Sequence, residues 1–201
     1  MIVTGIYYAL GLAAGGAMVV LLTQPVFGAP LFLLAAFCLY FFRDPDREIP
    51  PGAVAVSAAD GKVVAVKSEG NGRTRISIFL SIFDVHVNRS PIAGEITGLQ
   101  YNRGRFLVAS KEAASARNEQ NVITVNGGDT QVVFKQIAGI IARRIIFDKK
   151  VGDHVEKGER VGLIRFGSRT DIVFGDEWEV VVQKGQRVKG GSSIVAKRKQ
   201  E

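Results

Sequence analysis

Residues 54–66 have the sequence Val54-Ala55-Val56-Ser57-Ala58-Ala59-Asp60-Gly61-Lys62-Val63-Val64-Ala65-Val66. Two short runs rich in valine flank a centre in which aspartate precedes glycine, a pair that favours a tight turn. Valine is β-branched and packs well on a pleated surface, so each run predicts a strand. We therefore expect the body of the protein to consist of short strands joined by turns.

The same pattern continues towards the C-terminus. Short runs of β-branched and apolar residues recur between Gly, Asn and Asp, at positions 76–80, 122–125, 132–134, 161–164, 171–174 and 180–182. Turn residues at intervals of roughly eight to twelve positions are typical of all-β sandwiches and barrels. Only residues 106–121 have a weak helical pattern, so we predict a mostly β fold with antiparallel strands.

An internal sequence repeat makes the predicted fold more specific. Residues 151–162 resemble residues 182–191, because both place a glycine turn before a short strand, a basic turn and a second strand. Residues 60–63 and 93–96 repeat a smaller unit of the same kind. Two-fold repeats of this sort resemble the barrel-sandwich hybrid of lipoyl and biotinyl domains, a likeness of fold that assigns no function. We predict a barrel-sandwich-hybrid-like β domain.

The N-terminal part of the chain is apolar and uncharged. The chain carries 26 Lys and Arg and 19 Asp and Glu, with a net charge of +7, and none of them precedes Arg43. The run Ile2–Leu22 can span a hydrocarbon core of about 30 Å at about 1.5 Å per residue, whereas Val26–Phe42 is at the lower limit of spanning length. We expect a membrane-anchoring helical hairpin over residues 1–42, with a re-entrant or interfacial second segment as the alternative, and a domain over residues 43–201.

This charge distribution excludes a simple cytosolic protein, a disordered chain and a nucleic-acid binder with a basic N-terminus. The leader has no positively charged start of the kind that a cleaved secretory signal needs, so we expect it to be retained. In a hairpin, the domain emerges on the same side of the membrane as the N-terminus. Arg43 and Arg47 then favour the cytoplasmic face of the cell membrane.

The chain offers few metal ligands and few general bases. Cys38 is the single cysteine, which excludes an intramolecular disulfide and a cysteine-cluster metal site. Two histidines without a nearby His or Cys partner make a poor zinc site, so we predict no metal. His154 lies in the glycine-turn repeat, which favours a solvated turn residue. His86 follows a long apolar run, where a structural and a catalytic histidine fit the pattern equally well.

For three further residues, the local sequence does not decide between a role in a turn and a role in catalysis. Asp60 precedes a glycine, as turn aspartates often do. Gly167 and Ser168 follow a predicted strand, and Gly-Ser pairs are common in turns. No Gly-x-Ser-x-Gly sequence surrounds Ser168, which argues against an α/β-hydrolase.

Four sequence motifs, taken together in their order and spacing, relate these residues to one protein family. They are Phe42-Arg43-Asp44-Pro45-Asp46-Arg47-Glu48-Ile49-Pro50, Ala59-Asp60-Gly61, His86-Val87-Asn88-Arg89-Ser90-Pro91 and Phe166-Gly167-Ser168-Arg169. In order, in spacing and in the preceding apolar leader, they resemble the short form of phosphatidylserine decarboxylase, a group with archaetidylserine decarboxylase-like relatives. Longer members usually carry Gly-Ser-Thr or Gly-Ser-Ser where this chain has Gly-Ser-Arg. The resemblance implies a lyase of phospholipid biosynthesis that makes phosphatidylethanolamine.

Members of that family are made as zymogens that cut their own backbone before the serine of a Gly-Ser pair. The resemblance implies a cut between Gly167 and Ser168, which leaves a heterodimer of a β chain, residues 1–167, and an α chain, residues 168–201. It also implies that Ser168 becomes a covalent pyruvoyl group, with no external cofactor. Because a serine hydroxyl is a weak nucleophile, a base must take its proton and a third group must hold that base. We assign Ser168 as the nucleophile, His86 as the base and Asp60 as the orienting residue.

The resemblance also implies the later chemistry. The pyruvoyl ketone forms a Schiff base with the amine of phosphatidylserine or a related aminophospholipid, and the electrons left by CO₂ are delocalised into it. His86 then returns a proton to the substrate carbon. A diacyl substrate stays in the bilayer, so the expected partners are a phospholipid and the membrane rather than a nucleic acid, and an oligomer beyond the heterodimer stays open.

Two other functions remain as alternatives. A lipoyl- or biotinyl-like carrier would modify a hairpin lysine, but Asp148-Lys149-Lys150 is followed directly by Val151-Gly152-Asp153, with no strand between them. A membrane-anchored serine hydrolase would use Ser168, His86 and Asp60 without cutting the chain.

Overall fold

The structure is a computed structural model that describes residues 3–140, 144–165 and 167–199. The chain divides into two compact units, Met1–Asp46 and Arg47–Glu201. The first unit is helical and the second is mostly β. Phe166, which belongs to one of the quoted motifs, lies outside the described residues.

The first unit is a pair of apolar helices, α1 (Val3–Leu22) and α2 (Pro25–Phe41). By length and composition α1 can cross a membrane, while α2 is shorter. A Cβ atom added at Gly28 would lie 2.8 Å from the backbone oxygen of Gly16. Glycine at position 28 therefore lets the two helices approach closely, as is common between apolar helices. The structure therefore contains the two helices of the predicted hairpin, and their insertion into a membrane stays a prediction.

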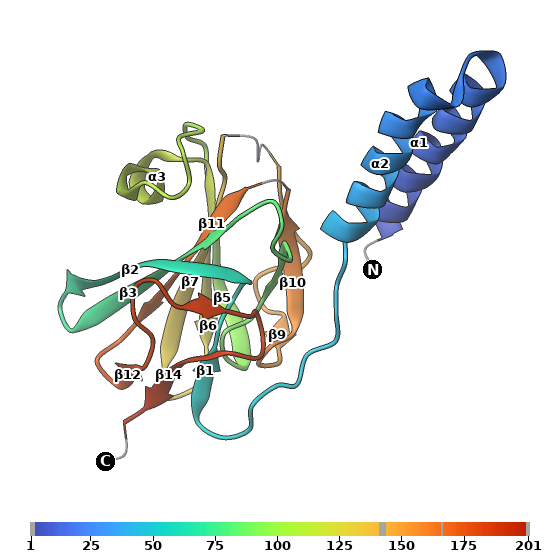
Figure 1. Cartoon of the computed structure of the whole chain (residues 1–201). Helices are drawn as coiled ribbons and strands as arrows, with labels where there is room; N and C mark the ends of the chain where they lie inside the picture. The colour runs from blue at the N-terminus through green and yellow to red at the C-terminus, as the bar shows by residue number, and fades with distance from the viewer. Residues whose placement is uncertain (1–2, 141–143, 166, 200–201) are drawn as a thin grey trace. The chain divides into compact units, whose positions relative to one another are not determined.

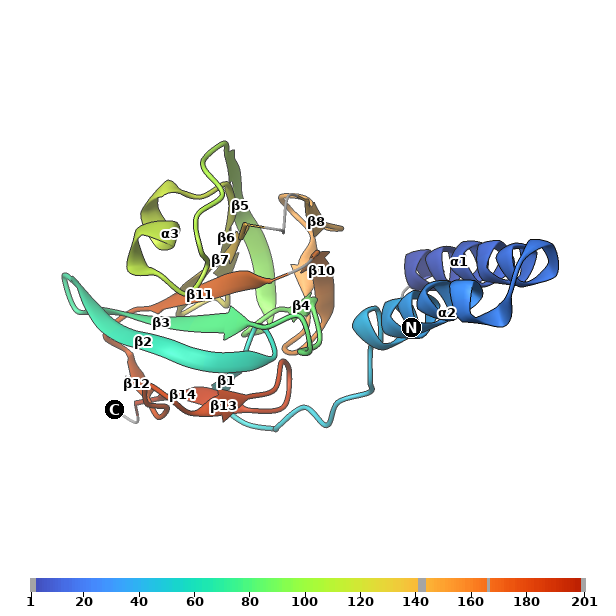
Figure 2. The ribbon, with the colours of Figure 1, turned by 45° about the horizontal axis from the view of Figure 1, so that its top comes forward.

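The second unit contains three antiparallel sheets among the described residues, which confirms the mostly β fold class (Figure 1). The largest sheet has eight strands in the order β13-β2-β3-β11-β7-β6-β5-β9. Its strands are β2 (Gly61–Gly70), β3 (Arg73–Leu80), β5 (Gly94–Asn102), β6 (Gln120–Asn126), β7 (Gln131–Ile137), β9 (His154–Val155), β11 (Ser168–Phe174) and β13 (Arg187–Val188). Figure 2 shows this sheet curling into a half-barrel, in agreement with the predicted barrel-like domain.

Two smaller sheets complete the unit, with the strand orders β1-β14-β12 and β4-β10-β8. Their strands are β1 (Val54–Val56), β4 (Val87–Arg89), β8 (Ile145–Phe147), β10 (Arg160–Ile164), β12 (Trp178–Val180) and β14 (Ile194–Arg198). A short helix, α3 (Glu112–Arg117), lies within the segment that has the weak helical pattern. Its acidic first residue and basic last residue suit the dipole of a helix.

The apolar core lies inside the curl of the large sheet. Alternate residues of β3 and β11 point into it, among them Ile76, Ile78 and Ile172. Strand β11 is central, because it pairs with β3 on one side and with β7 on the other. Six of its seven residues are buried, so both of its faces are covered. This strand begins at Ser168, which places the predicted reactive serine in the middle of the sheet.

Candidate active site

Ser168, the first residue of β11, has an unusual side-chain environment. It is fully buried, and its Oγ has no hydrogen-bond partner among the described residues. The residue before it, Gly167, has φ +61°, a left-handed conformation that glycine adopts without steric cost. A buried hydroxyl without a partner costs free energy, and such groups in a folded protein call for an explanation. Reactivity is one explanation, because an unpaired Oγ is free to move towards a base.

His86 lies next to Gly167. It directly precedes β4, which pairs with β10 so that Val87 faces Leu163, and the Ile164 backbone N–H donates to the His86 carbonyl oxygen at 3.3 Å. The backbone N–H of Gly167, the residue before Ser168, donates to Nε2 of His86 at 3.2 Å. Pairing of β4 with β10 therefore brings together two residues that are far apart in the sequence.

The other ring nitrogen of His86 is held by a backbone group. Nδ1 lies 2.9 Å from the carbonyl oxygen of Asp84. Since a carbonyl only accepts, Nδ1 carries the proton and Nε2 presents its lone pair to the turn before Ser168. The Asp84 carboxylate fixes this local geometry, because it accepts from both the backbone N–H and the hydroxyl of Ser81 at 2.8 Å. Arg187 forms an ion pair with the other carboxylate oxygen.

Asp60 lies in the turn between β1 and β2 and has partners of its own. One of its carboxylate oxygens accepts from Arg47 at 2.8 Å, and the other accepts from the Gly190 backbone N–H at 2.8 Å. Burial raises the pKa of Asp60, the hydrogen bond from Gly190 and the charge of Arg47 oppose that rise, and the nearby Asp84 charge adds to it. The role of Asp60 as an orienting residue for His86 stays a prediction.

The carbonyl group of Gly167 is packed tightly against the backbone of Gly139. A Cβ atom added at Gly139 would lie only 2.0 Å from the Gly167 oxygen and 3.4 Å from the Ala109 side chain. Any residue larger than glycine at position 139 would therefore displace this carbonyl. Next to it is an open, mostly apolar cavity of about 230 Å³, lined by Gly167 and by Phe79, Ser81, Ile82, Val108, Ala109 and Ile140.

A set of neutral polar side chains lies on the same face of β11 as Ser168. Thr170 is within 3.4 Å of the Asn88 amide nitrogen, and Gln136 donates to the Asn88 oxygen at 2.9 Å. All three side chains are fully buried. The Gln136 oxygen, like Ser168 Oγ, has no hydrogen-bond partner in the described part of the chain. This face of the strand is therefore uncharged and only partly hydrogen-bonded.

The structure thus brings His86, Gly167 and Ser168 together, with Asp60 held separately by Arg47 and Gly190. His154 lies elsewhere, on strand β9, with a side chain that is 67% exposed. Asp84 and Gly139 were not predicted as site residues. Asp84 acts on His86 through its main chain, and Gly139 acts by lacking a side chain, so neither has a side-chain signature. Within the described ranges, no group of three or more His, Cys, Asp or Glu is arranged to hold a metal ion.

The sequence was compared with protein families and with known proteins, and both comparisons point to one family. The family model for phosphatidylserine decarboxylase matches residues 34–196. A phosphatidylserine decarboxylase proenzyme from Solibacter usitatus is 66% identical over 195 residues, which cover 97% of this chain and 95% of the relative. Proteins with the same name from Chlorobium phaeobacteroides and Carboxydothermus hydrogenoformans are 40% and 46% identical, over 96% and 86% of this chain and 94% and 84% of their own lengths.

Proposed function

Because the chain belongs to the phosphatidylserine decarboxylase family, we propose that it becomes active by cutting its own backbone between Gly167 and Ser168 and converting Ser168 into a pyruvoyl group. The family membership makes the protein a decarboxylase that acts on phosphatidylserine. One observation carries the proposal about its maturation. Ser168, whose buried hydroxyl has no hydrogen-bond partner among the residues that the structure describes, directly follows a glycine whose N–H is bonded to His86.

The proposed cut is an intramolecular acyl shift. Ser168 Oγ attacks the Gly167 carbonyl carbon, the bond from that carbon to the Ser168 nitrogen breaks, and the hydroxyl proton passes to the departing nitrogen. Removal of the Ser168 α-proton then breaks the bond between Cβ and Oγ, which frees the Gly167 carboxylate and leaves dehydroalanine at the start of the second chain. One water molecule replaces the nitrogen, which leaves as ammonia, and a pyruvoyl group remains.

His86 is the proposed base for the first step. Its lone pair at Nε2 is directed to the Gly167 N–H at 3.2 Å, next to the bond that breaks. For this step the ring must redirect that lone pair to the hydroxyl proton of Ser168, the next residue, whose Oγ has no competing hydrogen bond within the described ranges. The Asp84 carbonyl at Nδ1 keeps the proton on the far nitrogen and stabilises the positive charge that develops. Asp60 is proposed to support the same histidine at longer range.

The site fits a pyruvoyl group at the start of β11. A small, flat group derived from serine would occupy the buried position of Ser168, at the end of a central strand with covered faces. When present, this ketone supplies an electrophile for the substrate amine and a sink for the electron pair left by CO₂. In the mature enzyme His86 is proposed to return a proton to the substrate carbon.

The two chains would remain associated after the cut. Strands β11 to β14 belong to residues 168–201, and each pairs with a strand of residues 1–167 or with another strand of the same fragment. Strand β11 is paired on both sides with strands of residues 1–167, namely β3 and β7. This interleaving supports a heterodimer of α and β chains that separates only on unfolding.

We propose that α1 and α2 anchor the enzyme in the cell membrane and that the β unit is on the cytoplasmic face. The support is the apolar character and length of α1 and the arginines that follow α2. The apolar cavity beside Gly167 suits the part of a phospholipid next to its headgroup. Removal of residues 1–42 should spare self-cleavage but lower activity on phosphatidylserine vesicles. Unchanged vesicle activity would show that the anchor is dispensable.

The test of the maturation proposal is Ser168→Ala, compared with Ser192→Ala in the same C-terminal fragment. On a denaturing gel we expect Ser168→Ala to remain one full-length chain and Ser192→Ala to be cut like the unaltered protein. Appearance of the 168–201 fragment in Ser168→Ala would overturn the assignment. Mass spectrometry separates the alternatives, because a carrier would have the added mass of an acyl group on a lysine and a serine hydrolase would have the mass of the uncut chain. The lysine that a carrier would use, Lys149, instead forms an ion pair with Glu159 at 2.5 Å.

A further inference from the structure

The outer face of β11 carries two charged residues that the proposed reaction does not use. Arg169 and Asp171 are 1% and 0% exposed, and they alternate with Ser168 and Thr170 along the strand. Burial of two ionised side chains is costly unless each is paired and hydrogen-bonded. Their position is unusual as well, because they are the second and fourth residues of the chain that the proposed cut would create.

Arg169 uses its guanidinium group on several partners at once. Its Nε donates to Asp171 at 2.6 Å, and Nη2 donates to the Ser77 hydroxyl at 2.6 Å. Nη1 donates to the backbone oxygen of Lys111 at 3.2 Å, and Glu112 is within 3.8 Å. The planar fork of arginine matches this set of acceptors in a way that lysine cannot.

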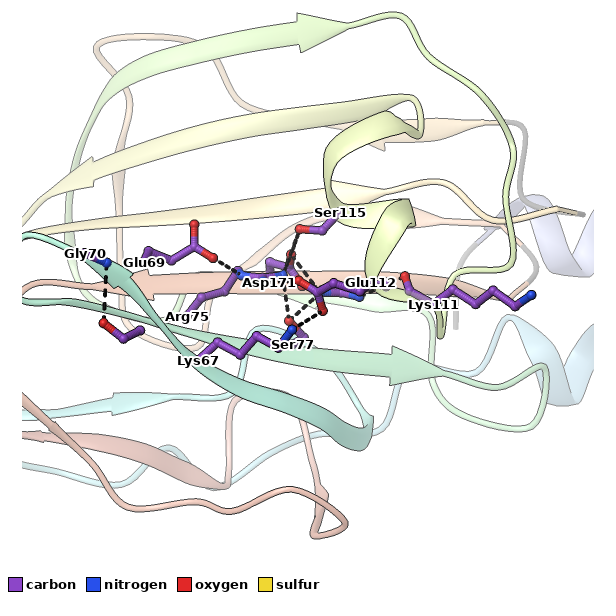
Figure 3. A network of polar contacts seen from close by, with 11 residues as sticks. Lys67, Glu69, Gly70, Arg75, Ser77, Lys111, Glu112, Ser115 and Asp171 are labelled. Carbon is purple, nitrogen blue, oxygen red and sulfur yellow. Dashed lines mark hydrogen bonds and ion pairs between the residues drawn. The ribbon is translucent and has the colours of Figure 1, made fainter.

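Arg75, on the neighbouring strand β3, completes the network (Figure 3). It donates to Asp171 at 3.2 Å, to Ser115 at 2.9 Å and to Glu69 at 2.5 Å, and it also binds Glu112. Burial acts to lower the pKa of Arg75, but its bond to Glu112 and the charge of Asp171 outweigh burial and raise it. The network contains three cations and three anions, Lys67, Arg75, Arg169, Glu69, Glu112 and Asp171.

The partners are divided between the two chains that cleavage would create. Arg169 and Asp171 would belong to the α chain. Every other member, which comprises residues of β2, β3 and the α3 segment, would belong to the β chain. We propose that this cluster is a clamp that holds the first residues of the α chain in register once the peptide bond before them is gone. The proposal rests on the self-cleavage proposed above.

The clamp answers a problem that the cut creates. A strand that is covalently continuous at both ends can open only by breaking contacts on both sides, whereas a strand with a free end can fray from that end. Reactive groups must be held to within about 0.5 Å of their working position. Arg169 and Asp171 fix the strand one and three residues after Ser168, from the face opposite the Ser168 side chain, so they act as positioning residues and not as catalytic ones.

The test compares Arg169→Met with Arg198→Met, each in the cleaving chain and in the uncleavable Ser168→Ala chain, all as full-length protein in detergent. Arg198 is a matched control, because it is also an α-chain arginine and pairs with Asp129 of the β chain at 2.6 Å. The readout is hydrogen exchange of the amides of residues 169–174, together with decarboxylation per cut chain.

We expect Arg169→Met to speed exchange of these amides about tenfold or more in the cut protein, as the loss of a hydrogen bond to a charged group implies. In the Ser168→Ala chain the same substitution should speed exchange only as far as it lowers the free energy of global unfolding, measured with urea, since the backbone still holds the strand; the acceleration in the cut protein should be greater. Decarboxylation per cut chain should fall in parallel, and Arg198→Met should change neither quantity. Arg169→Lys should restore only part of the loss.

Equal acceleration of exchange in the cut and uncut chains would overturn the clamp and leave an ordinary structural ion pair. Absence of cleavage in the unaltered protein would instead overturn the self-cleavage proposal, so the two failures are distinct. If Arg169→Met does not fold, Glu112→Gln makes the same test from the half-exposed edge of the cluster, with the same expected contrast between cut and uncut chains.

Discussion

The two faces of strand β11 differ in almost every physical property. On the inner face, Ser168 and Thr170 meet neutral side chains, and one hydroxyl and one amide oxygen have no hydrogen-bond partner in the described residues. On the outer face, Arg169 and Asp171 are surrounded by ion pairs and charge-assisted hydrogen bonds. These residues alternate along one strand, so the difference arises from side-chain direction alone.

The difference indicates that the two faces have separate functions, one in the reaction and one in holding the strand in place. A nucleophile needs freedom to move towards its base, and a network that saturated its hydroxyl would oppose that motion. The strand that carries it must nevertheless stay in place, and buried charged pairs are costly to disrupt. Placing the two requirements on opposite faces meets both, because the outer face can be rigid without touching the reacting atoms.

The largest expected effect comes from His86, which contacts the residue before Ser168. His86→Ala removes the group at Nε2 and should slow self-cleavage by about 10²- to 10⁴-fold, the usual contribution of a general base. A time course on denaturing gels measures the rate. His154→Ala, which changes the only other histidine of the chain, should cleave normally. Normal cleavage of His86→Ala would remove His86 from the maturation step.

A substitution on the outer face should act on stability. Asp171→Asn keeps the shape of the side chain but leaves two buried arginines short of a negative charge, which should cost about 3 kcal/mol. Urea unfolding in the Ser168→Ala background gives this value for a single uncut chain. Thr170→Val, on the inner face, removes only a 3.4 Å contact and should cost less than about 1 kcal/mol. Equal costs on the two faces would contradict the comparison.

The third prediction concerns the carbonyl that Ser168 attacks. Gly139→Ala places a methyl group where the Gly167 oxygen lies, at 2.0 Å, so the carbonyl must move. Misplacement by about 1 Å can cost about a hundredfold in rate, and we expect cleavage to slow by that order. Gly98→Ala is the control, since its new methyl group would meet only the Thr124 side chain, at 3.1 Å. A normal cleavage rate in Gly139→Ala would show that the carbonyl position is not critical.

The smallest effect is a pH dependence of the outer face. The hydrogen bond from Arg75, with the charges of Arg75, Arg169 and Lys67, lowers the pKa of Glu112, although burial opposes this. A carboxyl whose folded pKa is lowered adds stability that is complete above its unfolded value of about 4.3 and is lost as the pH falls through the folded value. Urea midpoints should therefore fall below about pH 4 less steeply in Glu112→Gln than in the unaltered chain. Identical slopes would contradict the pairing.

Much of the fold could be predicted from local patterns. Valine-rich runs such as 54–56 and 63–66 lie in β1 and β2, and the apolar leader forms α1 and α2, because alternation and continuous apolarity are properties of neighbouring residues. The Asp60–Gly61 turn followed from the same local chemistry. The number and order of the strands in the large sheet could not be predicted from local patterns, since pairing of β11 with β3 and β7 joins distant parts of the chain.

The site was predictable only where a motif names a side chain. His86, Gly167 and Ser168 were selected from the sequence, and the structure brings them together. The Asp84 carbonyl at Nδ1 left no signal, because any residue carries a carbonyl. The outer cluster was also missed, since Arg75 meets Asp171 across 96 positions and Glu112 across 37. In the sequence Arg169 stood out only as a departure from the Gly-Ser-Thr pattern of longer relatives.

The most direct measurement of the central claim is the intact mass of the purified full-length protein under denaturing conditions. We predict two polypeptides, residues 1–167 and residues 168–201, the second lighter by one ammonia than a fragment that begins with serine. A single polypeptide of 201 residues with the mass of its sequence would contradict the account.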